Sequence, residues 1–122
     1  MDKLTGRVAH IIFVLPLIAF GFGHFMNAKA MAAMVPLPFG EFWVYLTGAA
    51  LIAGAIGVIV NKMAKLAAFL LGVMIFIFAF ALHLRGMILA ETEAVKMMEM
   101  MQFMKDIAIA SGAWAISGKL KN

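Results

Sequence analysis

Long apolar runs separated by short polar breaks make up most of the chain from residue 8 onward. The first three runs span about residues 8–27, 41–60 and 63–86. Each holds about 20 residues or more, the length that an α-helix needs to cross the roughly 30 Å hydrocarbon core of a bilayer. Pro36 and Pro38 separate the first two runs, and Asn61 with Lys62 separates the second from the third. The pattern predicts three transmembrane helices, the first of them kinked at Pro16.

The last apolar run, residues 107–117, is too short to cross a bilayer by itself. A fourth span must therefore begin near residue 100 and end near residue 120. This takes Lys105 and Asp106 into the helix close to one end, where charges face the protein interior or reach to the interface. We interpret the mixed segment 87–100 as a loop or an interfacial helix. The expected fold is all-α, a transmembrane four-helix bundle that forms one domain over residues 1–122.

Composition favours the same class of protein. Hydrophobic residues make up 66% of the chain and charged residues 13%, whereas a soluble domain carries about 45–50% apolar and about 25% charged residues. The absence of cysteine excludes disulfides, thiolate metal sites and thiol catalysis. The sequence also contains no nucleotide-binding loop, nucleophile elbow or zinc signature. The net charge of +4 does not predict nucleic acid binding, because the basic residues sit singly at the ends of apolar runs.

The distribution of basic residues predicts the orientation of the chain in the membrane. One side of the bundle collects Lys3, Arg7, Lys62, Lys65, Lys119 and Lys121. The other side collects four basic and five acidic residues, which are Lys29, Arg85, Lys96, Lys105, Glu41, Glu91, Glu93, Glu99 and Asp106. We therefore expect both termini to be cytoplasmic. The segment Ala28-Lys29-Ala30 resembles a signal-peptidase site, but we expect the first apolar run to be retained as a span.

Small residues recur at helical spacing in two of the predicted spans. The sets are Ala49, Ala53 and Gly57; Ala50 and Gly54; Ala108 and Gly112; and Ser111 and Ala115. Such spacing lets helix backbones approach closely in lipid. The pattern is typical of packing within a bundle, and the alternative is an interface with a second copy or with a partner subunit.

Several short motifs occur in a characteristic order along the chain. They are Gly21-Phe22-Gly23-His24-Phe25, Met34-Val35-Pro36-Leu37-Pro38, Phe42-Trp43-Val44-Tyr45-Leu46-Thr47-Gly48, Lys65-Leu66-Ala67-Ala68, His83, and Lys105-Asp106-Ile107-Ala108. In this order they resemble the DoxX family of small four-helix bacterial membrane proteins, over nearly the whole chain. One departure is that many members carry a glutamate soon after the Thr-Gly of the second span, where this chain has Ala49 and Ala50.

The resemblance implies a multi-pass protein of the bacterial inner (cytoplasmic) membrane. The family is named after a subunit associated with thiosulfate:quinone oxidoreduction, and other members look like membrane partners of oxidoreductases. We therefore expect a subunit or partner of a membrane redox system, in contact with the lipid bilayer and with a membrane protein partner or a second copy. The alternative is a non-catalytic accessory or assembly subunit of a larger membrane complex. Whether the chain is an enzyme stays open.

Polar groups collect at the predicted outer ends of the spans. His24 lies about 16 residues beyond Val8, or roughly 24 Å along a helix, and His83 lies a similar distance beyond Lys65. The candidate ligand-binding residues at this level are His24, Tyr45, His83, Asp106, Arg85 and Glu41.

Three kinds of site fit these residues. Reduction of a quinone needs protons at its carbonyl oxygens, and Phe76, Phe80 and His83 share one helix face, which suits a flat ring with a polar end. His24 and His83 on facing helices could instead ligate a metal or a haem. The third interpretation is a structural cluster in which Asp106 pairs with Lys105 or Arg85 and lets the helix end enter the bilayer.

A run of methionines precedes the last apolar segment, at Met97, Met98, Met100, Met101 and Met104. Met97, Met101 and Met104 share one face of a helix. This face suits an amphipathic entry to the fourth span, docking against a partner, or soft coordination of Cu(I). The segment contains no cysteine or histidine that would support the copper interpretation.

Overall fold

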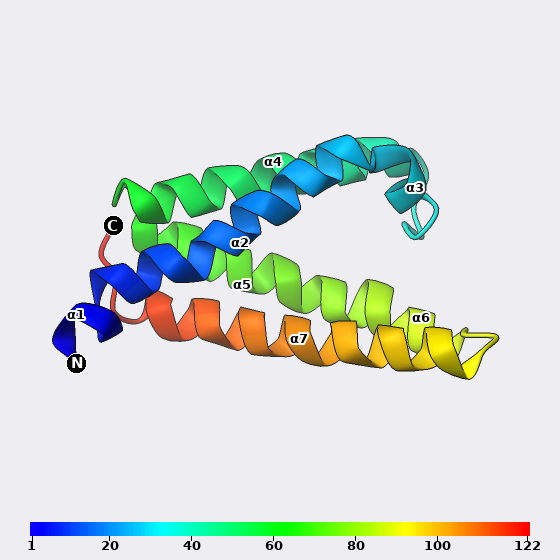
Figure 1. Cartoon of the computed structure of the whole chain (residues 1–122). Coiled ribbons are helices and arrows are strands. Elements are labelled where there is room, and N and C mark those ends of the chain that lie inside the picture. Colours follow the sequence, from blue (N-terminus) through cyan, green and yellow to red (C-terminus); the bar gives the residue numbers. More distant parts are fainter.

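The computed structural model describes the backbone of all 122 residues and every side chain except those of Asp2 and Lys3. Its regular elements are helices, shown in Figure 1. In chain order they are α1 (Asp2–Thr5), α2 (Arg7–Met26), α3 (Ala28–Ala32), α4 (Gly40–Ile59), α5 (Ala64–Phe78), the π-helical η1 (Ala79–Leu84), α6 (Arg85–Ile88) and α7 (Glu93–Ser117). The elements α5, η1 and α6 follow one another without a break and form a helical segment from Ala64 to Leu89.

The helices differ from the predicted pattern at three places. The predicted pattern begins at residue 8 and has no helix between residues 27 and 41, so it does not include the short helices α1 and α3. The third helical segment continues to Leu89 instead of ending near residue 86. The last helix begins at Glu93 and not near residue 100, because the Thr92 hydroxyl caps it by accepting a hydrogen bond from the Val95 N–H at 3.2 Å. Residues 93–99 are therefore regular helix, so of the two interpretations of segment 87–100, a loop or an interfacial helix, the loop is wrong for this part.

The long helices form two antiparallel pairs. Helix α2 packs against α4, α7 packs against α5, and contact between α4 and α5 joins the pairs. Figure 1 shows both termini at one end of the molecule, beside the α4–α5 turn, whereas the two pairs diverge toward the end that carries α3 and α6.

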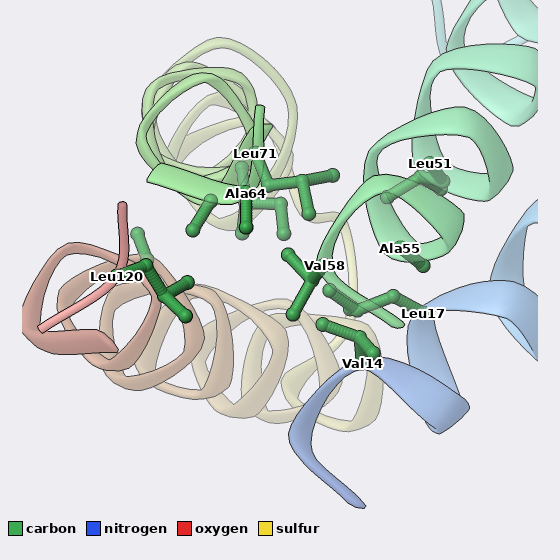
Figure 2. Close-up of a cluster of buried hydrophobic side chains, with 11 residues drawn as sticks. Val14, Leu17, Leu51, Ala55, Val58, Ala64, Leu71 and Leu120 are labelled. Carbon is green, nitrogen blue, oxygen red and sulfur yellow. The ribbon is translucent and has the colours of Figure 1, made fainter. Parts of the chain in front are cut away.

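The main hydrophobic cluster lies where the two pairs meet (Figure 2). It combines residues of α2 such as Val14 and Leu17, residues of α4 such as Ala55 and Val58, and Leu71 of α5. The end near α3 and α6 lies outside this cluster.

Three helical segments are long and apolar enough to cross a membrane, namely Arg7–Met26, Gly40–Ile59 and Ala64–Leu89. Less than a third of each is buried inside the protein. Because the rest of this apolar surface faces outward, it is compatible with contact with a lipid bilayer. Helix α7 is not one of these three, since its charged residues lower its mean hydropathy.

The α4–α5 turn is built by a C-terminal cap on α4. Asn61 takes a left-handed conformation with a φ of 60°. The Lys62 N–H bonds the Gly57 carbonyl at 3.0 Å, and the Asn61 N–H bonds the Val58 carbonyl at 3.3 Å, which is the Schellman pattern. The Arg7 guanidinium donates to the Val58 and Ile59 carbonyls and so places a positive charge at the negative end of the α4 dipole.

Small residues let the helices approach both within a pair and between the pairs, although only some of those predicted do so. Gly21 and Gly48 lie at the α2–α4 crossing, where a Cβ on either glycine would stand 2.9 Å from the carbonyl oxygen of the other. Gly54 and Gly57 face α5, and Gly112 faces the Phe13 ring of α2. The other predicted positions are exposed, namely Ala49, Ala50, Ala53, Ala108, Ser111 and Ala115.

Helix α7 is fixed on α5 by side-chain bonds to backbone. Trp114 lies against Gly72, and its indole N–H donates to the Phe69 carbonyl at 3.2 Å. At the C-terminal end of α7, the Ser117 hydroxyl donates to the Lys65 carbonyl at 2.9 Å. These bonds set the register of α7 on α5 and therefore decide which residues of α7 meet η1 at the far end.

Candidate functional site

His83 lies in η1, the π-helical turn within the third helical segment. A π-helix forms i→i+5 bonds and so has a wider turn than an α-helix; such turns occur frequently at functional sites. In this turn both Phe80 and His83 point at α7, since Phe80 contacts Phe103 and His83 contacts two carboxylates. Phe76 also contacts α7, at Trp114. The predicted common face of Phe76, Phe80 and His83 is therefore confirmed by their partners.

The two ring nitrogens of His83 each meet a carboxylate from α7. Nδ1 lies 2.8 Å from Oε2 of Glu99, and Nε2 lies 3.4 Å from Oδ2 of Asp106. Glu99 and Asp106 are seven residues apart, which is two turns of helix, so they project from the same face of α7. Both residues are only 8% exposed. We call this group the histidine–carboxylate cluster.

Gly86 makes room for one of these carboxylates. A Cβ at this position would stand 2.8 Å from Cδ and 2.9 Å from Oε2 of Glu99. Real Cβ atoms essentially never make contacts this short. The glycine therefore allows the Glu99 carboxylate to lie flat against the third helical segment and reach His83.

Aromatic rings extend from the cluster along the same interface. Phe80 and Phe103 meet edge to face with centroids 5.2 Å apart, Phe76 lies 4.9 Å from Phe80, and Trp114 lies 5.4 Å from Phe76. Phe103 stands on α7 between Glu99 and Asp106. The site thus combines ionisable groups with a wall of rings, within one pair of helices.

The cluster combines one histidine, which can both donate and accept a proton, with two carboxylates that accept hydrogen bonds when ionised. His83 Nδ1 lies within hydrogen-bond distance of Glu99, and Nε2 lies farther from Asp106, at 3.4 Å. The three groups are therefore of the chemical types that bind and pass on protons, and they lie between α7 and η1.

The structure brings together two of the predicted site residues, His83 and Asp106, and adds Glu99. The sequence-based interpretation placed Glu99 in a loop or an interfacial helix and did not include it among the site residues. The sequence feature that could have identified Glu99 is its spacing of seven residues from Asp106. This spacing puts both carboxylates on one face of the last helix, provided that the helix begins before residue 99. The predicted pairing of Asp106 with Lys105 or Arg85 is wrong, because Asp106 pairs with His83, whereas the Lys105 Nζ lies 5.2 Å above the Phe20 ring of α2.

The other predicted site residues lie elsewhere. His24 is on α2, its Nδ1 lies 2.6 Å from the Phe20 carbonyl oxygen, and its Cβ faces Gly48 of α4. Tyr45 is exposed on α4 and stacks on Phe25 at 5.6 Å. Glu41 begins α4 and Arg85 begins α6, both exposed.

The two histidines belong to different helix pairs, and these pairs diverge at this end of the molecule (Figure 1). Their partners differ as well, since His24 bonds within its own helix and His83 binds α7. Among the side chains that the structure describes, no group of three or more histidine, aspartate or glutamate residues is arranged to hold a metal ion.

Helix α7 has an inverted distribution of polarity. Its methionine face points outward, with Met97 61%, Met101 65% and Met104 65% exposed, whereas Glu99 and Asp106 point inward. In water the reverse is expected, with charges outside and methionine inside. Glu93, Lys96 and Lys105 of the same helix are exposed as well. The outward methionine face is compatible with contact with a lipid bilayer.

Comparisons with known proteins bear on the same stretch of chain. No curated protein and no solved structure gives a significant match. A family match covers residues 13–117, which include the histidine–carboxylate cluster and the Met97–Met104 run. The chain belongs to this family, which is described as a domain of unknown function, DUF8561.

Proposed function

We propose that this chain is a small integral membrane subunit of a redox system, in which the histidine–carboxylate cluster supplies protons to a bound quinone. The observation that carries this is the buried contact of His83 with Glu99 and Asp106, beside the Phe80–Phe103 ring pair. The resemblance to the DoxX family supports the assignment to a redox system.

The proposal includes a fourth span formed by α7, with both termini in the cytoplasm of a bacterium and the cluster near the outer surface of the inner membrane. Helix α7 has 25 residues and is about 38 Å long at 1.5 Å per residue, sufficient to cross the hydrocarbon core. Its outward methionines and inward carboxylates suit lipid on one side and protein on the other. The position of both termini at one end of the molecule agrees with an even number of crossings.

The chemistry assigned to the chain is limited to binding and proton transfer. A quinone becomes a quinol by taking up two electrons and two protons, and the electrons would come from a partner dehydrogenase. Phe80 and Phe103 would pack against the quinone ring, because aromatic faces and edges suit a flat apolar ring. His83 would give one proton to a carbonyl oxygen, and the second proton would come from the same imidazole after it is reprotonated from the aqueous surface, with Glu99 or Asp106 holding the ring in place.

The test is photolabelling of the purified full chain in a mild detergent with an azido-ubiquinone. We expect His83→Gln to abolish most of the labelling, because it removes the proton donor from the cluster. His24→Gln is the matched control, since His24 is the other half-buried histidine at the same end and lies on the other helix pair. Equal labelling of the two variants, with both folded by circular dichroism, would reject the quinone site.

A second candidate function is that of a non-catalytic accessory or assembly subunit. The observation that favours it is the exposed face of α7, where the methionines continue into Ala108, Ser111 and Ala115. Small residues and methionine together form a surface that a partner helix can approach closely. Gentle solubilisation followed by identification of co-purifying proteins separates the two functions. A stable lone chain that still binds quinone supports the first, and an obligate complex that binds none supports the second.

A further inference from the structure

An open apolar groove runs along the surface of the molecule between α4 and α5. Its volume is about 640 Å³. Exposed Ala50 and Ala53 line the α4 side, and exposed Leu70 and Ile77 line the α5 side. The groove exists because the α4 residues that line it have small side chains. At Gly54 the two helices are in contact, since a Cβ there would stand 2.8 Å from Leu71 of α5.

The groove has charge at one end only. Among the described residues that line it, Lys62 in the α4–α5 turn is charged and the others are apolar. An occupant that matches this surface has a long apolar part and one anionic end. A partner helix would place side chains along the whole length of the groove. An anionic phospholipid instead has long apolar acyl chains and one charged headgroup, which match the apolar lining and Lys62.

The position of Lys62 is fixed by the cap on α4. Its N–H bonds the Gly57 carbonyl at 3.0 Å, and the left-handed Asn61 turns the chain immediately before it. Among the described side chains, none with a carboxylate forms an ion pair with Lys62. Lys65 follows on α5, and its N–H lies 3.4 Å from the carbonyl oxygen of Lys121, so further basic residues lie at this end.

We propose that the α4–α5 groove binds one anionic phospholipid, with an acyl chain between the two helices and the phosphate at Lys62. Basic residues near a membrane surface attract anionic headgroups. This site lies away from the histidine–carboxylate cluster and shares with the proposed function only the placement of the chain in a bilayer.

The test is native mass spectrometry of the full chain in detergent, titrated with phosphatidylglycerol or with phosphatidylcholine of the same acyl chains. We expect the unmodified chain to retain phosphatidylglycerol in preference to phosphatidylcholine. Lys62→Gln should lower phosphatidylglycerol binding about fivefold, the effect of one basic residue near the headgroup, and leave phosphatidylcholine binding unchanged. Ala53→Leu fills the groove and should lower binding of both lipids.

Two variants serve as controls. Ala49→Leu makes the same change on α4 at an exposed position outside the groove, and Lys29→Gln removes a charge from the opposite end of the molecule. Both should bind lipid as the unmodified chain does. Unchanged binding in Ala53→Leu, or equal loss in Lys62→Gln and Lys29→Gln, would overturn the proposal. So would a change of oligomeric state in Ala53→Leu with lipid binding intact, since the groove would then belong to a second copy.

Discussion

At Gly86 the lack of a side chain decides whether Glu99 can reach His83. The Cβ of Gly86→Ala would clash with the carboxylate of Glu99, so that either the carboxylate moves away from His83 or the helices separate. We expect a loss of about 1–3 kcal/mol in unfolding free energy, as for other overpacked sites. Thermal unfolding in detergent, followed by circular dichroism, measures it.

Gly23→Ala is the control at the residue scale. A Cβ there meets nothing within 4 Å, and Gly23 lies inside α2. Alanine in a helix interior is more stable than glycine by roughly 0.5–1 kcal/mol. The two substitutions should therefore shift the melting temperature in opposite directions, and a shift of the same sign would show that Gly86 has no role in placing Glu99.

At the scale of elements, the end of α4 offers a separate test. Asn61→Val puts a β-branched residue at a left-handed position, which costs roughly 1–2 kcal/mol. Asn61→Gly keeps the Schellman cap and should be neutral or slightly stabilising. Unfolding in detergent compares them, and equal stability of the two variants would contradict a left-handed Asn61.

The helices that could be predicted from the sequence are those bounded by local signals. The bounds of α2 and α4 lie within one residue of the predicted spans, because apolar length and proline breaks depend on local chemistry. Helix α7 was harder to predict, since Glu99 counts as a solvated charge until its partner on another helix is known. His83 and Asp106 were identified as candidates, but their meeting depends on the π turn at residues 79–84 and on Gly86. Neither has a signal in a single sequence.

At the scale of the whole molecule, the polar groups separate into two layers. The termini, the α4–α5 turn and Lys62 lie at the end where the hydrophobic cluster joins both pairs (Figures 1 and 2). The histidine–carboxylate cluster lies toward the other end, inside one pair. Because its three residues come from η1 and α7 alone, the cluster depends on the packing between the third helical segment and α7.

The orientation of this molecule in a membrane can be tested directly because the chain contains no cysteine. Single cysteines at exposed positions then report their side through a membrane-impermeant maleimide applied to intact spheroplasts. Lys29→Cys lies in α3, Glu91→Cys lies in the connection between α6 and α7, and Lys121→Cys lies near the C-terminus. With four spans and cytoplasmic termini, the first two should be labelled and the third should react only after lysis. If α7 does not cross, Glu91→Cys and Lys121→Cys must share one side, so equal labelling of these two would remove the fourth span and the outer location of the cluster together.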